Sequence, residues 1–404
     1  MDKNKIFEYH SEFKGKTGTY IKTKVENKED LSIAYTPGVA EVCREIHKDV
    51  ENVYKYTAKS NTVAIVSDGT AVLGLGNIGP EAALPVMEGK ALLFKKFANI
   101  DAVSICIPGN LSAEYISDFI KNISHTFGGI NLEDVASPKC FEINKNLEGS
   151  KIAYFHDDQH GTAVVVLAAL LNSLKLAEKK LSQIRIVING AGAAGLAIAE
   201  ILVEAGANNI VLCDIDGIIN KDNYKYNKRK RFLKFNKENI SGNLENAMKK
   251  ADVFIGVSKG NIVKSEWVNS MNEKSIVFAM ANPEPEIMPD QALKAGAYIV
   301  ATGRSDFPNQ VNNVLGFPGI FRGALDSKAS CINLKMCVEA ALALSEVLDN
   351  NEISKEKILP DPFDKRVVPQ IAGRVAKSAS EQGLSPFKGF ALKTIMKKIM
   401  QSEN

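Results

Sequence analysis

Acidic residues stand in adjacent pairs at two places in the sequence. Glu133 and Asp134 follow a short apolar run, and Asp157 and Asp158 lie in the stretch FHDDQHGTA at 155–163. Carboxylate oxygens are the ligands that hard divalent cations such as Mg²⁺ and Mn²⁺ prefer, and open coordination positions would let the cation bind a substrate directly. The two pairs therefore predict a Mg²⁺ or Mn²⁺ site. Capping of the following helix by Asp157 or Asp158 is an alternative that explains one carboxylate.

The same stretch has a second interpretation, the helical motif of zinc proteases. His156 and His160 are four positions apart with acidic residues between them. That motif requires both histidines on one face of a helix. Because His156 is expected to end a strand at 152–155, a zinc hydrolase is disfavoured.

A glycine-rich motif, GAGAAG at 190–195, follows the apolar segment 184–189 and precedes a predicted helix at 196–205. Such a helix start binds the pyrophosphate of a dinucleotide. Asp214 closes the next predicted strand, where a carboxylate holds the ribose hydroxyls and repels a 2′-phosphate, and residues 215–217 supply no Arg or Lys. We therefore expect NAD, with NADP as the alternative. The residues expected at the cofactor are Gly190, Gly192, Ala193, Ala194, Gly195 and Asp214.

GLGNIG at 74–79 fits the same glycine pattern. No acidic residue follows it at the end of a second strand, because a predicted helix that includes 82–97 fills that place. We interpret this motif as a tight loop that requires positive φ angles.

Residues 221–237 hold eight Lys and Arg residues with aromatic residues between them. The favoured interpretation is a solvated surface segment. A nucleic-acid patch is disfavoured because no recognition module surrounds the run. The remaining alternative is recruitment of an anionic effector or of a cofactor phosphate.

Buried strands alternate with helices along most of the chain, which predicts an α/β protein with a doubly wound parallel sheet. A boundary near 145–160 would divide the chain into a first domain at 1–150 and a Rossmann-type dinucleotide-binding domain with C-terminal helices at 151–404. The predicted strands are 62–67, 102–107, 152–155, 184–189, 209–213, 253–257, 275–279 and 298–300. The predicted helices include 82–97, 112–124, 160–176, 196–205, 334–348 and 367–382.

The bulk composition is that of an ordinary globular protein. The chain has 404 residues, of which 45% are hydrophobic and 24% charged, and its formal net charge is +3. None of the six cysteines forms a CxxC pair, and no signal peptide or uncharged apolar span of membrane length is recognised. We expect a cytoplasmic protein with no nucleic-acid or membrane partner.

Taken together, these motifs resemble those of a known family, the malic enzymes, and specifically the short bacterial type that decarboxylates malate oxidatively. The resemblance runs through nearly the whole chain. The stretches that carry it are IAYTPGVA (33–40), SDGTAVLGLGNIG (67–79), PVMEGKALLFKKF (85–97), INLED (130–134), FHDDQHGTA (155–163), 188–195, FAMANPE (278–284), NNVLGFPGIFRG (312–323) and 360–376.

The resemblance implies a role for individual residues. Tyr35 matches the family's general acid and Lys90 its catalytic lysine, whose pKa a nearby cation and burial should depress. Asn282 matches a residue at substrate and cofactor, and Asn312, preferred to Asn313, a second substrate asparagine. The implied metal ligands are Glu133, Asp134 and Asp158.

The resemblance also implies an N-terminal substrate domain, an NAD(P) domain and a homodimer with its site near the interface. Ala71 stands where long-type enzymes carry an arginine for the substrate, so the anchor of the distal malate carboxylate is undetermined. The implied reaction is metal-dependent conversion of L-malate to pyruvate and CO₂ with reduction of NAD(P). The alternatives are malate dehydrogenation without decarboxylation and a non-catalytic nucleotide-sensing module.

Overall fold

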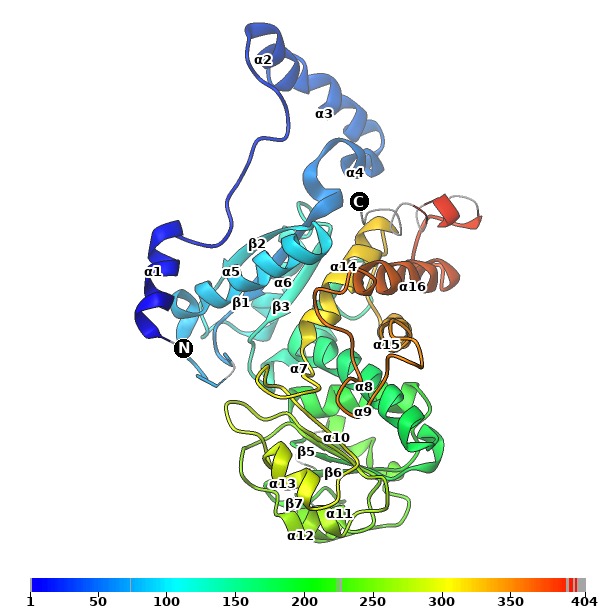
Figure 1. The fold of residues 1–404 in the computed structure, drawn as a ribbon. Coiled ribbons are helices and arrows are strands. Elements are labelled where there is room, and N and C mark those ends of the chain that lie inside the picture. Colours follow the sequence, from blue (N-terminus) through cyan, green and yellow to red (C-terminus); the bar gives the residue numbers. More distant parts are fainter. Residues whose placement is uncertain are drawn as a thin grey trace.

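The computed structural model describes residues 2–72, 74–222, 224, 227–389, 392–394 and 397, and these residues form two α/β sheets (Figure 1). The first sheet has four parallel strands in the order β2–β1–β3–β4. The second has six strands in the order β10–β9–β8–β5–β6–β7. The α/β prediction is confirmed. The antiparallel β7, Gly217–Ile218, is the one departure from parallel pairing in the described second sheet.

Helices cover both faces of the first sheet because its strands alternate their apolar side chains. Ala64 and Val66 pack in one cluster with α6 and α7, whereas Val63 and Ile65 pack on the opposite face with α5. The elements of this sheet are β1 Thr62–Ser67, α5 Gly79–Ala98, β2 Asp101–Cys106, α6 Ala113–Ile123, β3 Gly129–Glu133, α7 Lys139–Leu147 and β4 Tyr154–His156.

The second sheet is doubly wound in the same way. Val187 and Phe254 face a cluster shared with α11–α13, and Ile186 and Ile255 face α8, α9 and the C-terminal helices. Its strands are β5 Ile186–Asn189, β6 Ile210–Asp214, β7, β8 Val253–Gly256, β9 Ile276–Ala279 and β10 Ile299–Thr302. Its helices are α8 Thr162–Ala177, α9 Ala193–Glu204, α10 Asn227–Lys230, α11 Leu244–Met248, α12 Ser265–Asn269 and α13 Pro289–Lys294.

The C-terminal helices return to the first sheet. α14, Phe317–Asp326, places Phe317 and Phe321 against Phe94 of α5, with ring centroids 4.8 and 5.2 Å apart. α15, Leu334–Ser345, and α16, Val367–Glu381, pack on one another and on α8 and α14 respectively. Strand β4 also lies beyond residue 150 yet pairs with β3 of the first sheet. The division of the chain at 150 stays a prediction.

α8 is the most deeply buried of the long helices and continues from a π-helical turn at Asp157–Gly161. By length and composition the segment Asp157–Ala177 could cross a membrane, but 72% of its most apolar window is buried inside the protein, which is how a core helix is placed. The sequence analysis recognised no such span because it considered uncharged segments only. This segment reaches its full length because it includes the charged residues Asp157 and Asp158.

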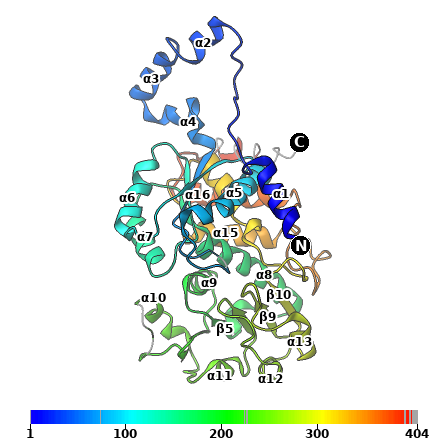
Figure 2. The same cartoon turned by 90° about the vertical axis from the view of Figure 1, so that its left-hand side faces the viewer.

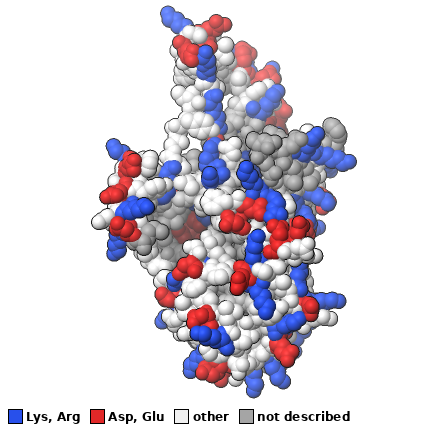
Figure 3. Space-filling view, in the orientation of Figure 1, with Lys and Arg blue, Asp and Glu red and all other residues white. Residues whose placement is uncertain are grey.

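The N-terminal region is built differently. α2, Lys28–Ala34, α3, Val39–Lys48, and α4, Val53–Tyr56, form an arm that stands away from both sheets (Figures 1 and 2). None of residues 2–62, which include α1, Lys3–Phe13, is buried. On the face that Figure 3 shows, Lys and Arg are interspersed with Asp and Glu, so no single sign of charge dominates it.

Candidate active site

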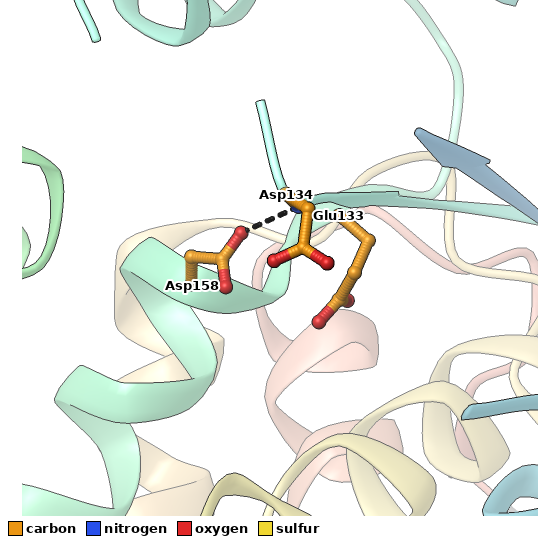
Figure 4. A group of neighbouring side chains, drawn as sticks. All are labelled: Glu133, Asp134 and Asp158. Atoms are coloured by element: carbon orange, nitrogen blue, oxygen red, sulfur yellow. Dashed lines mark hydrogen bonds between the residues drawn. The ribbon is translucent and has the colours of Figure 1, made fainter. Parts of the chain in front are cut away.

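Three carboxylates converge at the carboxyl end of β3. Glu133 ends the strand and Asp134 follows it, while Asp158 approaches from the π-helical turn before α8 (Figure 4). One carboxylate oxygen of each lies within 4.8 Å of those of the other two. Asp134 adopts a left-handed backbone conformation with φ 54°, and its N–H donates to Asp158 Oδ2 at 2.8 Å. The sequence prediction that these three residues come together therefore agrees with their placement.

Their electrostatics fit a site for a divalent cation. Burial, together with the charge of Asp158, raises the pKa of Glu133 to about 7 and that of Asp134 to about 8. Burial and the neighbouring Asp157 raise the pKa of Asp158 to about 6. Asp134 Oδ2 is buried with no hydrogen-bond partner among the described residues. Because close buried carboxylates without a compensating charge are costly, these three residues fit Mg²⁺ or Mn²⁺.

Neighbouring residues hold the Glu133 side chain and the Asp134 backbone in place. Asn131 Nδ2 donates to Glu133 Oε2 at 2.8 Å, and the N–H of Ala71 donates to the carbonyl oxygen of Asp134 at 3.0 Å. The motif at 74–79 is a tight loop in which Gly74, Gly76 and Gly79 have φ angles of 75°, 72° and 79°. The predicted need for positive φ is confirmed.

Lys90 projects from the middle of α5 into the same cluster. Its Nζ lies 3.1 Å from Glu133 Oε1, donates to Asp157 Oδ2, and sits 4.1 Å from the ring centroid of Phe317. Its side chain is only 7% exposed. Burial lowers the Lys90 pKa, but the carboxylates of Asp157 and Glu133 outweigh it and raise the pKa above its ordinary value. Without a bound cation, Asp157, Glu133 and Asp158 therefore stabilise the ammonium form of Lys90, and the depressed pKa expected from a nearby cation and burial stays a prediction.

Asp157, which the sequence places in an acidic pair without indicating a role beside Lys90, is a further residue of the site. It is fully buried and its Oδ2 accepts hydrogen bonds from Lys90 Nζ and Asn313 Nδ2. Burial raises its pKa to about 7. The signal in the sequence was the adjacent pair Asp157-Asp158, of which only one can join Glu133 and Asp134.

The two asparagines at 312 and 313 are used differently. Asn312 Oδ1 accepts from the N–H of Val314 at 3.0 Å and so caps the short helix Asn313–Leu315. Asn313 points instead to Asp157. The role of Asn312 at the substrate stays a prediction, and the geometry brings Asn313, the alternative, into the Lys90 cluster.

Asn282 lies in a loop that a buried glutamate holds in place. Glu286, fully buried, accepts from the N–H of Ser258 at 3.1 Å and from the N–H of Ala281 at 3.0 Å. It thereby ties the loop after β8 to the loop after β9, at the carboxyl edge where ligands of such sheets bind. Sequence reasoning also missed Glu286, because its partners are distant in the chain.

Tyr35 does not lie with these residues. It follows α2 at the far end of the arm, and its side chain is 68% exposed. Within one chain, the residue expected to act as general acid is therefore separated from Lys90.

The motif at 190–195 forms the expected turn between β5 and α9. Gly190 has φ 105°, and a Cβ on Gly195 would lie 1.9 Å from the carbonyl oxygen of Gly190. Gly192 precedes the helix without a side-chain cap, so the first N–H groups of α9, in Ala193 and Ala194, are not bonded to a capping side chain. A Cβ on Gly192 would meet no atom within 4 Å. These features fit a dinucleotide pyrophosphate.

The basic segment after β7 is not simply solvated. Arg229 and Phe232 are only 4% and 3% exposed, and Arg229 donates to the carboxylate of Asp214. This corrects the favoured interpretation of the run. Lys225, within it, lies outside the described residues. Asp214 ends β6 as expected.

Comparison with known proteins gives consistent matches. The model of the malic enzyme N-terminal domain matches residues 14–116, and that of the malic enzyme NAD-binding domain matches 159–380. A bifunctional malic/malolactic enzyme from Bacillus subtilis is 52% identical over 93% of this chain and 92% of its own length. An NADP-dependent malic enzyme from Halomonas elongata is 43% identical over 96% of both chains.

The fold is also that of a solved malic enzyme. The crystal structure of the enzyme from Pyrococcus horikoshii superposes with a TM-score of 0.92 at 46% identity, covering 98% of this chain and 95% of the other. The helical turn that carries Asp158 packs against α9, so the acidic cluster and the glycine-rich turn at 190–195 are neighbours. On sequence, fold and arrangement of these residues, the chain belongs to the malic enzyme family.

Proposed function

We propose that this protein converts L-malate to pyruvate and CO₂ and reduces NAD or NADP, with Mg²⁺ or Mn²⁺ as the metal. The observation that carries the proposal is the buried Lys90, bonded to Asp157 and Glu133 at the edge of the three-carboxylate cluster. The family supports the substrate, and its relatives include an NADP-dependent enzyme.

Glu133, Asp134 and Asp158 would hold the cation. When bound, the cation supplies a Lewis acid toward the hydroxyl and carboxylate oxygens of malate. Asn131 donates to one oxygen of Glu133, and the Asp134 N–H donates to one oxygen of Asp158, which restricts the orientation of both carboxylates.

Lys90 and Asp157 would move the first proton. Lys90 Nζ donates to Asp157 Oδ2, so Asp157 Oδ2 is the atom that can take a proton from the ammonium. In the protein without a bound cation the Lys90 pKa lies above that of Asp157, so this transfer requires that a bound cation lower the Lys90 pKa. The neutral amine of Lys90 then accepts the proton of the malate 2-hydroxyl. Asn313 fixes Asp157, and the ring of Phe317 lies beside Lys90 and keeps bulk water from that side.

Tyr35 would return a proton to the carbon that loses CO₂, and this requires a second chain. The arm has no buried residue, and Leu31, Ile33 and Tyr35 are 53%, 69% and 68% exposed. Such a run of exposed apolar side chains is typical of an interface. We propose a homodimer in which the arm packs on the partner and Tyr35 reaches the partner's Lys90 site.

The activity is tested by following absorbance at 340 nm with L-malate and either NAD or NADP, with Mn²⁺ or with EDTA, while pyruvate is assayed in the same tube. We expect reduced cofactor and pyruvate in equal amounts, only with metal. Reduced cofactor without pyruvate would indicate dehydrogenation alone. No signal with either cofactor would favour a non-catalytic protein.

The exchanged arm is tested by mixing two inactive variants. Lys90→Ala and Tyr35→Phe chains are unfolded together, refolded and assayed. In a dimer with exchanged arms, each mixed dimer has one site with both Lys90 and Tyr35 intact and one site that lacks both. Each mixed dimer should therefore recover about half of the activity of a wild-type dimer. Without exchange every site lacks one of the two residues. Activity no higher than the sum of the separate variants, with mixed dimers shown to be present, would refute the exchange.

A further inference from the structure

The basic segment returns to the turn that would hold the cofactor. Arg229 Nε and Nη2 donate to the carbonyl oxygen of Ala191 at 3.0 and 2.7 Å, and Nη2 also donates to Asp214 Oδ2. One guanidinium therefore joins the glycine-rich turn to the acidic residue that ends β6. Its burial, with 4% exposed, shows that the contact is part of the packed structure.

An aromatic anchor holds this arginine in place. Phe232, three residues on, is 3% exposed and lies with Leu212 and Ile219 beside Arg229. A second arginine of the same segment behaves differently: Arg231 is 52% exposed and pairs with Glu200 at 3.0 Å. Arg229 is thus placed at Asp214 specifically, and Arg231 offers a matched control from the same segment.

The ion pair between Arg229 and Asp214 changes the charge that the end of β6 presents to a bound ribose. A lone carboxylate at this position binds the two hydroxyls of NAD and repels the 2′-phosphate of NADP. Arg229 compensates that negative charge, and a guanidinium is the group that best binds phosphate. Asp214 keeps 28% of its side chain exposed, so it remains accessible to a ribose.

We propose that Asp214 and Arg229 together determine cofactor choice, with Asp214 favouring NAD and Arg229 keeping NADP as a usable cofactor. Arg229 is thus a specificity-determining residue that lies outside the glycine motif. The inference rests on the proposed function insofar as a dinucleotide binds at Gly190–Gly195. Residues 215–217 supply no Arg or Lys beside Asp214, as the sequence shows, and the arginine that reaches it comes from the basic segment at 221–237.

The test is a direct binding measurement on the full-length protein without malate or metal. Dissociation constants for NADH and NADPH are obtained from the change in nicotinamide fluorescence. Arg229→Gln retains a donor for Ala191 but removes the charge. We expect it to weaken NADPH by about tenfold and NADH by less than about threefold. Arg231→Gln should leave both constants unchanged.

Asp214→Asn provides the opposite change and does not depend on the folding of the Arg229 variant. With Arg229 released from its carboxylate partner, NADPH should bind about tenfold more tightly while NADH weakens. Thermal melting of each variant separates loss of the site from loss of the fold.

The outcomes are distinguishable. Wild-type protein that binds neither cofactor would refute the proposed function. Wild-type protein that binds NADH but not NADPH, or variants that leave the ratio of the two constants unchanged, would overturn the role of Arg229 and leave the proposed function intact.

Discussion

Lys90 and Tyr35, the two residues assigned to proton transfer, lie in regions that are built in opposite ways. Lys90 sits in the middle of the 20-residue helix α5 with its side chain 7% exposed, while Tyr35 follows the seven-residue helix α2 and is 68% exposed. The first is held by packing within its own chain. The second has no such support. Under the proposed mechanism, one chain preorganises the metal ligands and the base, whereas the acid depends on assembly with a second chain.

The largest loss of activity is expected from a substitution in the packed region around Lys90. Lys90→Ala should lower kcat by on the order of 10³–10⁴-fold, because it removes the group that accepts the hydroxyl proton. The cofactor site is separate, so NADH should bind as before. Steady-state kinetics and NADH fluorescence check this, and near-normal turnover would remove Lys90 from its role.

Asp158→Asn should remove one metal ligand from the packed region. Binding of Mn²⁺ to the folded state raises the melting temperature of the wild-type protein by mass action, and the variant should lose most of that rise. In EDTA the variant should melt no lower than wild type, because a carboxylate that repels Asp134 has gone. An equal Mn²⁺ shift in both proteins would contradict the ligand assignment.

Tyr35→Phe tests the arm. We expect kcat for pyruvate to fall by about 10²-fold from loss of the proton donor. The melting temperature should change little, because Tyr35 is exposed within its own chain and the substitution keeps the aromatic ring that the arm would place on the partner. Comparison with Lys90→Ala sharpens the contrast, since only the latter also disturbs a buried ion cluster. A large loss of stability in Tyr35→Phe would place Tyr35 in a packed core instead.

The smallest effect is a pH dependence of the metal-free protein. The folded-state pKa values of Glu133 and Asp134, about 7 and about 8, exceed their unfolded values near 4. The folded state therefore binds more protons in this window, and the free energy of unfolding falls as pH rises from about 4 to about 8. Lys90, whose pKa is raised, stays protonated in both states there.

In EDTA this should lower the melting temperature by a few degrees between pH 6 and pH 8. Mn²⁺ should abolish the trend. The Asp158→Asn protein, with less repulsion, should show a flatter one. A melting temperature that rises with pH in EDTA would contradict the burial of these carboxylates.

Much of the fold was predictable because strand and helix periodicities are local. Each predicted strand overlaps an observed one, from β1 to β10. β3 was not named as a strand, although the apolar run before Glu133 was noticed. The two-residue strand β7 is too short to give a periodic signal. The positions of helix ends differ by a few residues, where capping rather than periodicity decides.

The site was predictable as far as motifs reach. The convergence of Glu133, Asp134 and Asp158 followed from their residue types and the family. The contacts of Asp157, Asn313 and Arg229 did not, because each joins segments far apart in the chain and depends on side-chain direction. The exposed position of Tyr35 was not predictable either, because a sequence motif does not indicate whether a residue packs within its own chain.

The helix α8 has a consequence for how this protein can be cut or recombined. Asp157 and Asp158 stand at its start, and the rest of the helix forms the core against which the second sheet packs. A break in the chain near residue 150 would leave Glu133 and Asp134 on one fragment and Asp158 on the other. The three carboxylates of the candidate metal site are therefore shared between the segments before and after residue 150, and a chimaera joined there would take them from two different relatives.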